Sequence, residues 1–327
     1  MNRPLSRRDF LKVGSSAVAV AVAAAAASMG ADGTGLYDGE IVDTHVHLWD
    51  LSKLKPPWVA SATGRARAVL GHDHLLADYV EAARGLRITR GVYMEVDVAE
   101  EDQAREAKSV SDLCAAGGSP LVAAVISGRP AAAGFAAYLD PFRGNPFIKG
   151  VRQVLHRADM PARSCLEPAF VRGVRELGRR GLSFDLVLRN DQLDSGAELV
   201  DLCPGTRFVL DHCGNPHAGT AGLRAWEQGL ARIAAAKNRD VVCKVSGVYG
   251  NVSDRAWPAE RLAPLVRAVI DRFGWDRVMF AGDWPVVDLG SSLRGWVAAV
   301  KRIVAADRPE HQAGLFAGNA RKFYALG

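Results

Sequence analysis

Apolar and β-branched residues gather in eight short runs along the chain, each with the length typical of a strand. Segments typical of helices lie between several of these runs, as at 101–115, 168–180 and 259–273. Strands that alternate with helices predict an α/β protein with a parallel sheet. Eight such units favour a (β/α)₈ TIM barrel over a doubly wound sheet, as a single domain at residues 36–327. The runs lie at 41–48, 89–97, 121–127, 148–155, 183–188, 207–212, 240–247 and 277–283.

The second run alternates in a way that predicts which face each side chain occupies. Val92 and Met94 share one face, whereas Tyr93 and Glu95 share the other. We expect the apolar face to pack against helices. Glu95 would then point into the barrel near its mouth.

Polar residues stand at the ends of several runs, and these ends meet at one mouth of a barrel. His45 and His47 are two positions apart, so their side chains lie on the same face of the first strand. Two such imidazoles can bind one metal ion, or bind and polarise a substrate group. His212 ends the sixth run as a third imidazole, and Asp283 ends the eighth, where it can act as a general base.

Further side chains are candidates for substrate binding. Arg152 lies within the fourth run, so it either binds a substrate carboxylate or forms a buried ion pair with Glu95. Lys244 lies among valines and must be paired or functional, and His156 follows the fourth run. Trp58 belongs to an irregular insertion at 49–71, where it either lines a substrate pocket or packs the insertion down.

The N-terminal residues are typical of an export signal and are not expected to belong to the folded domain. The segment 6–12 reads SRRDFLK, a twin-arginine pattern, and an alanine-rich run at 13–27 follows it. This run is shorter than the roughly 20 apolar residues of a stable membrane span. We therefore expect a signal peptide at 1–27, recognised by the twin-arginine export machinery, and a periplasmic or secreted protein.

Charge and cysteine content narrow the function classes. The chain carries a net charge of +5, and residues 1–27 supply +3 of it through four basic residues and Asp9, so about +2 remains. Nucleic-acid binding therefore has no compositional support. The five cysteines are scattered and form no CxxC pair, which predicts small buried residues rather than a zinc knuckle or a disulfide framework. The sequence does not determine an oligomeric state.

An ordered set of motifs resembles the amidohydrolase-2 branch of the amidohydrolase superfamily, and within it the lactonase group related to fuconolactonases, rhamnonolactonases and pyrone-dicarboxylate lactonases. Two departures from this pattern are Gly282, where serine often precedes the aspartate, and Asp185, where the fifth strand often offers histidine. The motifs are DTHVHLW at 43–49, KGVR at 149–152, DHCGNP at 211–216, KVSG at 244–247, DWPV at 283–286 and GNA at 318–320.

The resemblance implies a catalytic centre at His45, His47, His212 and Asp283, with one divalent ion, zinc in the first place, or none. It implies hydrolysis of a small sugar-type or carboxylated lactone, with Asp283 activating water and the histidines polarising the carbonyl. Two alternatives are a metal-dependent, non-oxidative decarboxylase of the same superfamily and a non-catalytic periplasmic carbohydrate-binding barrel.

Overall fold

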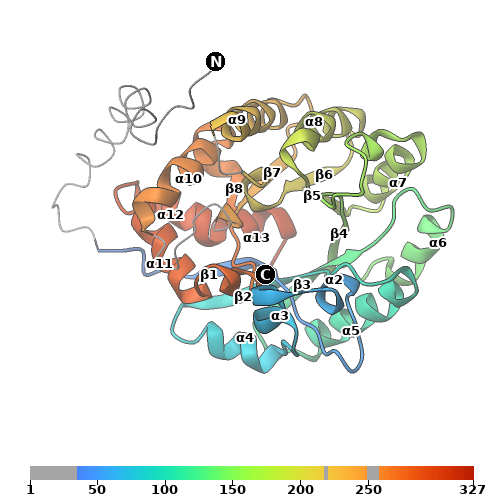
Figure 1. Ribbon diagram of the computed structural model, residues 1–327, viewed down its shortest axis with the longest axis horizontal. Coiled ribbons are helices and arrows are strands. Elements are labelled where there is room, and N and C mark those ends of the chain that lie inside the picture. The colour runs from blue at the N-terminus through green and yellow to red at the C-terminus, as the bar shows by residue number, and fades with distance from the viewer. Residues whose placement is uncertain (1–34, 217–219, 249–257) are drawn as a thin grey trace, which may run out of the picture.

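A computed structural model describes residues 35–216, 220–248 and 258–327. Its eight strands are parallel and follow one another around the sheet in chain order (Figure 1). The backbone N–H of Asp283 donates to His45 O at 2.8 Å, and that of His47 donates to Trp284 O at 2.8 Å. These bonds join the first strand to the segment after the last, so the predicted TIM barrel is confirmed. The strands are β1 (Ile41–Val46), β2 (Ile88–Met94), β3 (Leu121–Ser127), β4 (Ile148–Val154), β5 (Ser183–Val187), β6 (Arg207–Leu210), β7 (Val241–Val245) and β8 (Val278–Phe280).

Helices surround the strands, and the three helical segments predicted from the sequence correspond to α5, α7 and α10 (Figure 1). Their apolar faces pack against the outer surface of the sheet and form the larger hydrophobic core. The helices are α2 (Pro57–Ala60), α3 (Gly64–Leu70), α4 (Leu76–Ala82), α5 (Gln103–Ala116), α6 (Phe135–Leu139), α7 (Pro168–Arg179), α8 (Leu193–Leu202), α9 (Thr220–Ala234), α10 (Ala259–Phe273), α11 (Leu293–Ile303), α12 (Pro309–Ala313) and α13 (Asn319–Tyr324).

A second, smaller core fills the inside of the barrel. It combines inward-facing side chains of several strands, such as Val42, Val125 and Met279, with Tyr324 of α13. Helix α13 contacts both β1 and β8, and Arg321 on it forms an ion pair with Glu40, which directly precedes β1. The C-terminal segment therefore closes one end of the barrel with apolar side chains and leaves polar chemistry to the other end.

The face assignment predicted for β2 is wrong. Val92 and Met94 point into the barrel, where they join the inner core. Tyr93 points outward and donates a hydrogen bond to Glu106 of α5 at 3.0 Å. In a barrel both faces of a strand are buried, so alternation of polarity does not by itself tell the inside from the outside. Glu95, the first residue after β2, nevertheless faces inward, where its carboxylate accepts a hydrogen bond from Arg152 of β4.

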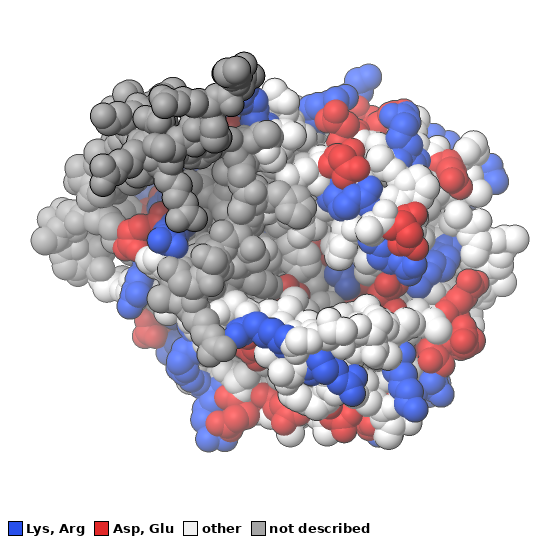
Figure 2. Space-filling view, viewed as in Figure 1, with Lys and Arg blue, Asp and Glu red and all other residues white. Residues whose placement is uncertain are grey.

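The insertion after β1 forms two short helices, α2 and α3, beside the polar end of the barrel. Arg65 of α3 donates a hydrogen bond to Leu289 O at 2.7 Å, which ties the insertion to the segment that follows β8. Acidic and basic side chains are interspersed over the described part of the face in Figure 2, in keeping with the small net charge expected without residues 1–27.

The five cysteines are buried and none forms a disulfide, as predicted. No helix in the described ranges has the length and apolar content needed to cross a membrane. The predicted signal peptide at 1–27 lies outside the described residues.

Candidate active site

The polar residues predicted at the strand ends do converge on one mouth of the barrel. Two of them, His212 and Asp283, have positive φ angles of 54° and 57°. Such angles are uncommon for residues other than glycine, and each costs on the order of 1–3 kcal/mol, which contacts of the surrounding structure have to offset. Both follow the last paired residue of their strands, where the chain leaves the sheet and turns the side chain towards the barrel axis.

His45, His47 and Asp283 form a compact group. The Nε2 atoms of the two histidines are 3.1 Å apart. Oδ1 of Asp283 lies 3.6 Å from Nε2 of His45 and 3.4 Å from Nε2 of His47. Nδ1 of His47 lies 3.0 Å from the carbonyl oxygen of Met94, which can only accept, so this nitrogen carries the proton and Nε2 is left with a free lone pair.

This donor set fits a divalent metal ion. Two ligand atoms at about 2.0–2.1 Å from a tetrahedral zinc ion are about 3.3 Å from each other. The three separations within the group, 3.1, 3.4 and 3.6 Å, lie around that value. Nε2 of His47 therefore lies where it can bind the same ion as His45 and Asp283.

His212 lies on the other side of the Asp283 carboxylate. Its Nδ1 atom is 3.8 Å from Oδ2 of Asp283 and 3.0 Å from the hydroxyl of Ser246. Gly247 makes room for the ring, because a Cβ atom at this position would lie 2.4 Å from Cβ of His212. The metal-ligand set predicted from sequence is thus divided: His45, His47 and Asp283 form one group, and His212 groups instead with His45 and Asp211.

Arg152 forms the buried ion pair that the sequence left open as an alternative. Its Nε donates to Oε1 of Glu95 at 2.5 Å, and its Nη2 donates to the backbone oxygen of the same residue at 2.8 Å. Nη1 donates to Oδ2 of Asp211 at 3.3 Å. Arg152 reaches the cavity wall with only 4 % of its surface exposed, so its charge is largely engaged by protein.

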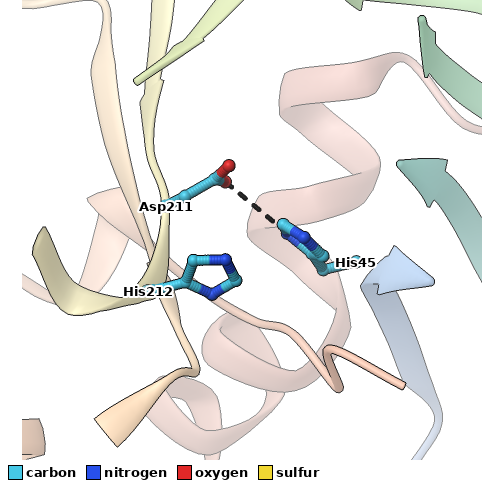
Figure 3. A group of neighbouring side chains, drawn as sticks. All are labelled: His45, Asp211 and His212. Atoms are coloured by element: carbon cyan, nitrogen blue, oxygen red, sulfur yellow. Dashed lines mark ion pairs between the residues drawn. The ribbon is translucent and has the colours of Figure 1, made fainter. Parts of the chain in front are cut away.

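Lys244 and Glu95, which the sequence suggested as substrate-binding residues, do not belong to the lining of the cavity. Lys244 is completely buried behind His45, and its Nζ lies 2.7 Å from Oδ2 of Asp185 and 3.0 Å from Oδ1 of Asp211. Figure 3 shows the Asp211 carboxylate directed at the His45 ring, with Oδ1 of Asp211 3.6 Å from Nδ1 of His45. Completely buried charges of this kind need partners within the protein, and here they find them.

Burial and neighbouring charge set the protonation of these groups. Burial lowers the pKa of His45 well below its usual value, and the positive charge of Lys244 lowers it further. Burial also lowers the pKa of His212. Burial alone would raise the pKa of Asp211, but Lys244 and the neighbouring His45 outweigh it, so that this pKa lies well below its usual range. Both imidazoles are therefore neutral near pH 7, the form that can bind a metal ion.

A cavity of about 1140 Å³ opens above these groups. Its lining includes His47, His212 and Asp283, together with Trp58 and His156. Trp58 donates its indole N–H to the backbone oxygen of Val96 at 2.7 Å, which fixes the ring on the cavity wall. The side chain of His156 faces the open cavity but has protein around its other sides, and this burial lowers its pKa to about 4.

Two residues that support the site were given no role from sequence. Asp43 accepts hydrogen bonds from the backbone N–H of His45 at 3.1 Å and of Gly282 at 2.6 Å, and so links the two ends of the catalytic group. A Cβ at position 282 would lie 2.3 Å from this carboxylate, which explains the glycine there. The sequence placed Asp211 in the motif beside His212 but predicted no role for it, because its partners come from strands that are distant in the chain.

Three imidazoles and a carboxylate meet at the mouth of this TIM barrel. This arrangement is typical of barrel enzymes whose catalytic centre can bind a metal ion. The family model described as amidohydrolase matches residues 42–326, almost the whole of this barrel. The chain therefore belongs to the amidohydrolase family, and it is a hydrolase.

Two proteins are similar to this chain in sequence, and one solved structure is similar to it in fold. The uncharacterized protein y4mH of Sinorhizobium fredii is 30% identical, over 88% of this chain and 99% of that protein. The L-fucono-1,5-lactonase of Burkholderia ambifaria is 26% identical, over 87% of this chain and 95% of that enzyme. An amidohydrolase of Burkholderia multivorans was solved with bound HEPES and, in another crystal form, with bound zinc. Its TM-scores are 0.77 and 0.76, at 24% identity, and the match covers 88% of this chain and 100% of that one.

Proposed function

We propose that this enzyme hydrolyses a sugar-type or carboxylated lactone to the open hydroxy acid. The observation that carries the proposal is the position of Asp283, with Oδ1 facing His45 and His47 and Oδ2 facing His212 at the floor of the cavity. A carboxylate between imidazoles in this way can hold and deprotonate a water molecule beside a carbonyl group. The similarity to an L-fucono-1,5-lactonase supports a cyclic ester as that carbonyl group.

The reaction needs two proton transfers. Asp283 takes a proton from water as the water oxygen bonds to the lactone carbonyl carbon. The ring carbon–oxygen bond then breaks, and the same proton passes from Asp283 to the leaving oxygen, so that a carboxylic acid and a hydroxyl group result. His212 is neutral and carries one ring N–H, which can stabilise the negative charge that develops on the carbonyl oxygen.

His45, His47 and Asp283 would hold one divalent ion, zinc in the first place. Such an ion, when bound, polarises a carbonyl oxygen and lowers the pKa of a water molecule that it binds. The carbonyl oxygen of Met94 keeps the proton of His47 on Nδ1, and Asp43 keeps the backbone of His45 in place. These contacts hold the two imidazoles in the orientation that the ion requires.

The walls of the cavity support a polar substrate held against an aromatic ring. Trp58 offers a ring face typical of sugar-binding sites, and His156 offers a neutral imidazole for a hydroxyl group. Arg129 also lines the cavity, where it forms an ion pair with Asp97 at 3.1 Å. The carboxylate of a carboxylated lactone would bind near the guanidinium group of Arg129, whereas the hydroxyl groups of a neutral sugar lactone would form hydrogen bonds with groups such as His156.

The test is a panel of sugar lactones and carboxylated lactones, assayed by proton release and by mass spectrometry of the product, before and after treatment with a chelator. We expect a ring-opened acid from at least one member with a kcat/KM above about 10⁴ M⁻¹s⁻¹, which is typical of enzymes acting on their own substrates. We also expect chelation to abolish turnover and zinc to restore it. Release of CO₂ from carboxylated members would favour a decarboxylase, and tight binding without turnover would favour a binding protein.

A further inference from the structure

An ion pair between Arg129 and Asp97 forms part of the cavity wall. The two residues follow β3 and β2, whereas the catalytic group comes from the ends of β1, β6 and β8. Nη2 of Arg129 donates to Oδ1 of Asp97 at 3.1 Å, and the two side chains keep 22 % and 14 % of their surface exposed. The pair is therefore shielded from bulk water and open to a molecule in the cavity.

The pair offers both hydrogen-bond donors and an acceptor. Within the described residues, Nη1 of Arg129 donates to Gly128 O, and Nη2 donates to Asp97 and to Val98 O. A guanidinium group has five N–H bonds, so the Nε–H and one hydrogen of Nη1 have no acceptor in this part of the chain. Oδ2 of Asp97 likewise accepts no hydrogen bond there, and neither it nor Nε is a buried atom. These groups are free to bind a substrate.

The backbone holds Asp97 in an uncommon conformation beside Arg129. Its φ angle is 47°, and its backbone N–H donates to Oε2 of Glu95 at 2.6 Å. Glu95 in turn accepts from the buried Arg152 at 2.5 Å. A positive φ is unfavourable for residues other than glycine, although aspartate and asparagine tolerate it best. The buried ion pair behind the catalytic group therefore also fixes the Asp97 carboxylate at the cavity wall.

Each of the three arginines in the described lining already has a carboxylate partner. The pairs are Arg129–Asp97 at 3.1 Å, Arg152–Glu95 at 2.5 Å and Arg157–Asp159 at 2.7 Å. A substrate carboxylate that binds Arg129 has to compete with Asp97 and meets its negative charge at short range, where like charges repel strongly. A hydroxyl group carries no charge, and it can accept from Arg129 and donate to Asp97.

We propose that the Asp97–Arg129 pair makes the enzyme select neutral, polyhydroxylated lactones over lactones that carry a carboxylate. Neighbouring hydroxyl groups of a sugar can use both members of the pair at once, so no charge is left unpaired. Arg129 supplies the attraction, and Asp97 supplies the repulsion that excludes the wrong substrate. The inference rests on the proposed function in taking a lactone as the substrate, and it names the kind of lactone.

The test compares lactones that differ only at one end of the molecule. D-Galactono-1,4-lactone and D-glucono-1,4-lactone carry a terminal CH₂OH group, whereas D-galactaro-1,4-lactone and D-glucaro-1,4-lactone carry a carboxylate there. We expect the unmodified protein to show a kcat/KM about tenfold or more higher for the neutral member of a pair, the usual effect of one contact with a charged group. Asp97→Asn keeps the shape and tolerates the positive φ, but it leaves Arg129 free to bind a carboxylate. This variant should raise kcat/KM for the carboxylated member by about tenfold or more and change that of the neutral member little.

Two further variants complete the comparison. Arg129→Gln keeps hydrogen-bonding groups but leaves the charge of Asp97 alone on the wall, so it should lower kcat/KM more for the carboxylated member than for the neutral one. Asp102→Asn is the matched control. Asp102 forms an ion pair of the same kind with Arg105 at 2.6 Å but does not belong to the described lining, so neither substrate should be affected.

The outcomes separate this inference from the proposed function. A preference of the unmodified protein for the carboxylated member, or an unchanged ratio in a folded Asp97→Asn protein, would overturn the inference. Equal losses on both members would overturn it too, because the pair would then only hold its two loops together.

Binding of the same four lactones to Asp283→Asn, with and without Asp97→Asn, is measured by titration calorimetry. If none is hydrolysed but the neutral members bind better and Asp97→Asn reverses the order, the inference holds and the proposed function fails for these lactones. If none is hydrolysed or bound while another lactone of the panel is opened, the inference fails and the proposed function stands.

Discussion

Two layers of buried polar residues lie at the same end of the barrel and differ in what surrounds them. The cavity layer is His45, His47, His212 and Asp283, and three of its members line the cavity. The ion layer is Glu95, Arg152, Asp185, Asp211 and Lys244, and its members have protein on all or nearly all sides. Both layers contain titratable side chains at strand ends, so the type of residue does not distinguish them. Access to the cavity distinguishes them instead: three of the four residues of the cavity layer line the cavity, but only Arg152 of the ion layer does.

The two layers also carry charge differently. In the ion layer every charge faces an opposite one, with Arg152 between Glu95 and Asp211 and Lys244 between Asp185 and Asp211. In the cavity layer the single carboxylate faces imidazole rings, and that of His212 is neutral. Charges that are paired inside a protein maintain its geometry, whereas a carboxylate beside neutral groups remains available for proton transfer. His45 belongs to both layers, and through it the paired charges orient the catalytic group.

The largest expected effect comes from exchanging one aspartate of each layer for asparagine. Asp283→Asn should lower kcat by about 10²–10⁴-fold, the usual contribution of a general base, with little change in stability. Asparagine tolerates the positive φ at this position, so the backbone is kept. Asp185→Asn should mainly lower the free energy of unfolding. Activity assays and urea denaturation of both variants give the comparison, and equal loss of activity at unchanged stability in the two would remove the distinction between the layers.

The next effect concerns the ion layer alone. Arg152→Met leaves Glu95 buried without its partner and should lower the free energy of unfolding by about 3–5 kcal/mol. Adding Glu95→Gln removes the unpaired charge and should recover part of that loss, as urea denaturation of the single and double variants can measure. If Arg152→Met is as stable as the unmodified protein, the ion pairs are not what holds this layer together.

The smallest expected effect concerns Glu106, which lies outside both layers on α5 and is buried against β2. Its Oε1 accepts hydrogen bonds from Tyr93 at 3.0 Å and from the backbone of Val96 at 2.9 Å. Burial and the charge of Glu95 raise its pKa from 4.5 to about 7. The folded state thus holds this proton more tightly than the unfolded state does. Its contribution to stability is complete below about pH 4.5 and is lost as the pH rises to about 7.

Glu106→Gln imitates the protonated form and should remove this dependence. Above pH 7 the variant should be more stable than the unmodified protein by up to about 3 kcal/mol, since one pKa unit corresponds to about 1.4 kcal/mol. Thermal and urea unfolding between pH 4 and 8 measure the difference. Glu101→Gln, at an exposed position of the preceding turn, is the matched control and should change little. A variant that follows the unmodified protein at every pH would show that Glu106 stays ionised.

Much of the fold could be predicted from sequence because strand and helix patterns are local. Each of the eight strands begins within one residue of the start of its predicted run. Several end earlier than predicted, because the polar residues at the ends of the runs lie beyond the last residue of the strand. The inner and outer faces of β2 could not be predicted, since both are buried. Arg152 remained open between ion pair and substrate contact, because its partners Glu95 and Asp211 come from other strands.

The sequence by itself determined which residues stand at strand ends, and therefore that His45, His47, His212 and Asp283 meet at one mouth. It also determined the family, because the motifs are contiguous and ordered. Only the tertiary structure decided which charged residues face the cavity and which face one another. That division depends on distances between strands far apart in the chain, and on whether water or protein lies beside each side chain. Local sequence encodes neither the distances between strands nor the surroundings of a side chain, and these two properties separate the cavity layer from the ion layer.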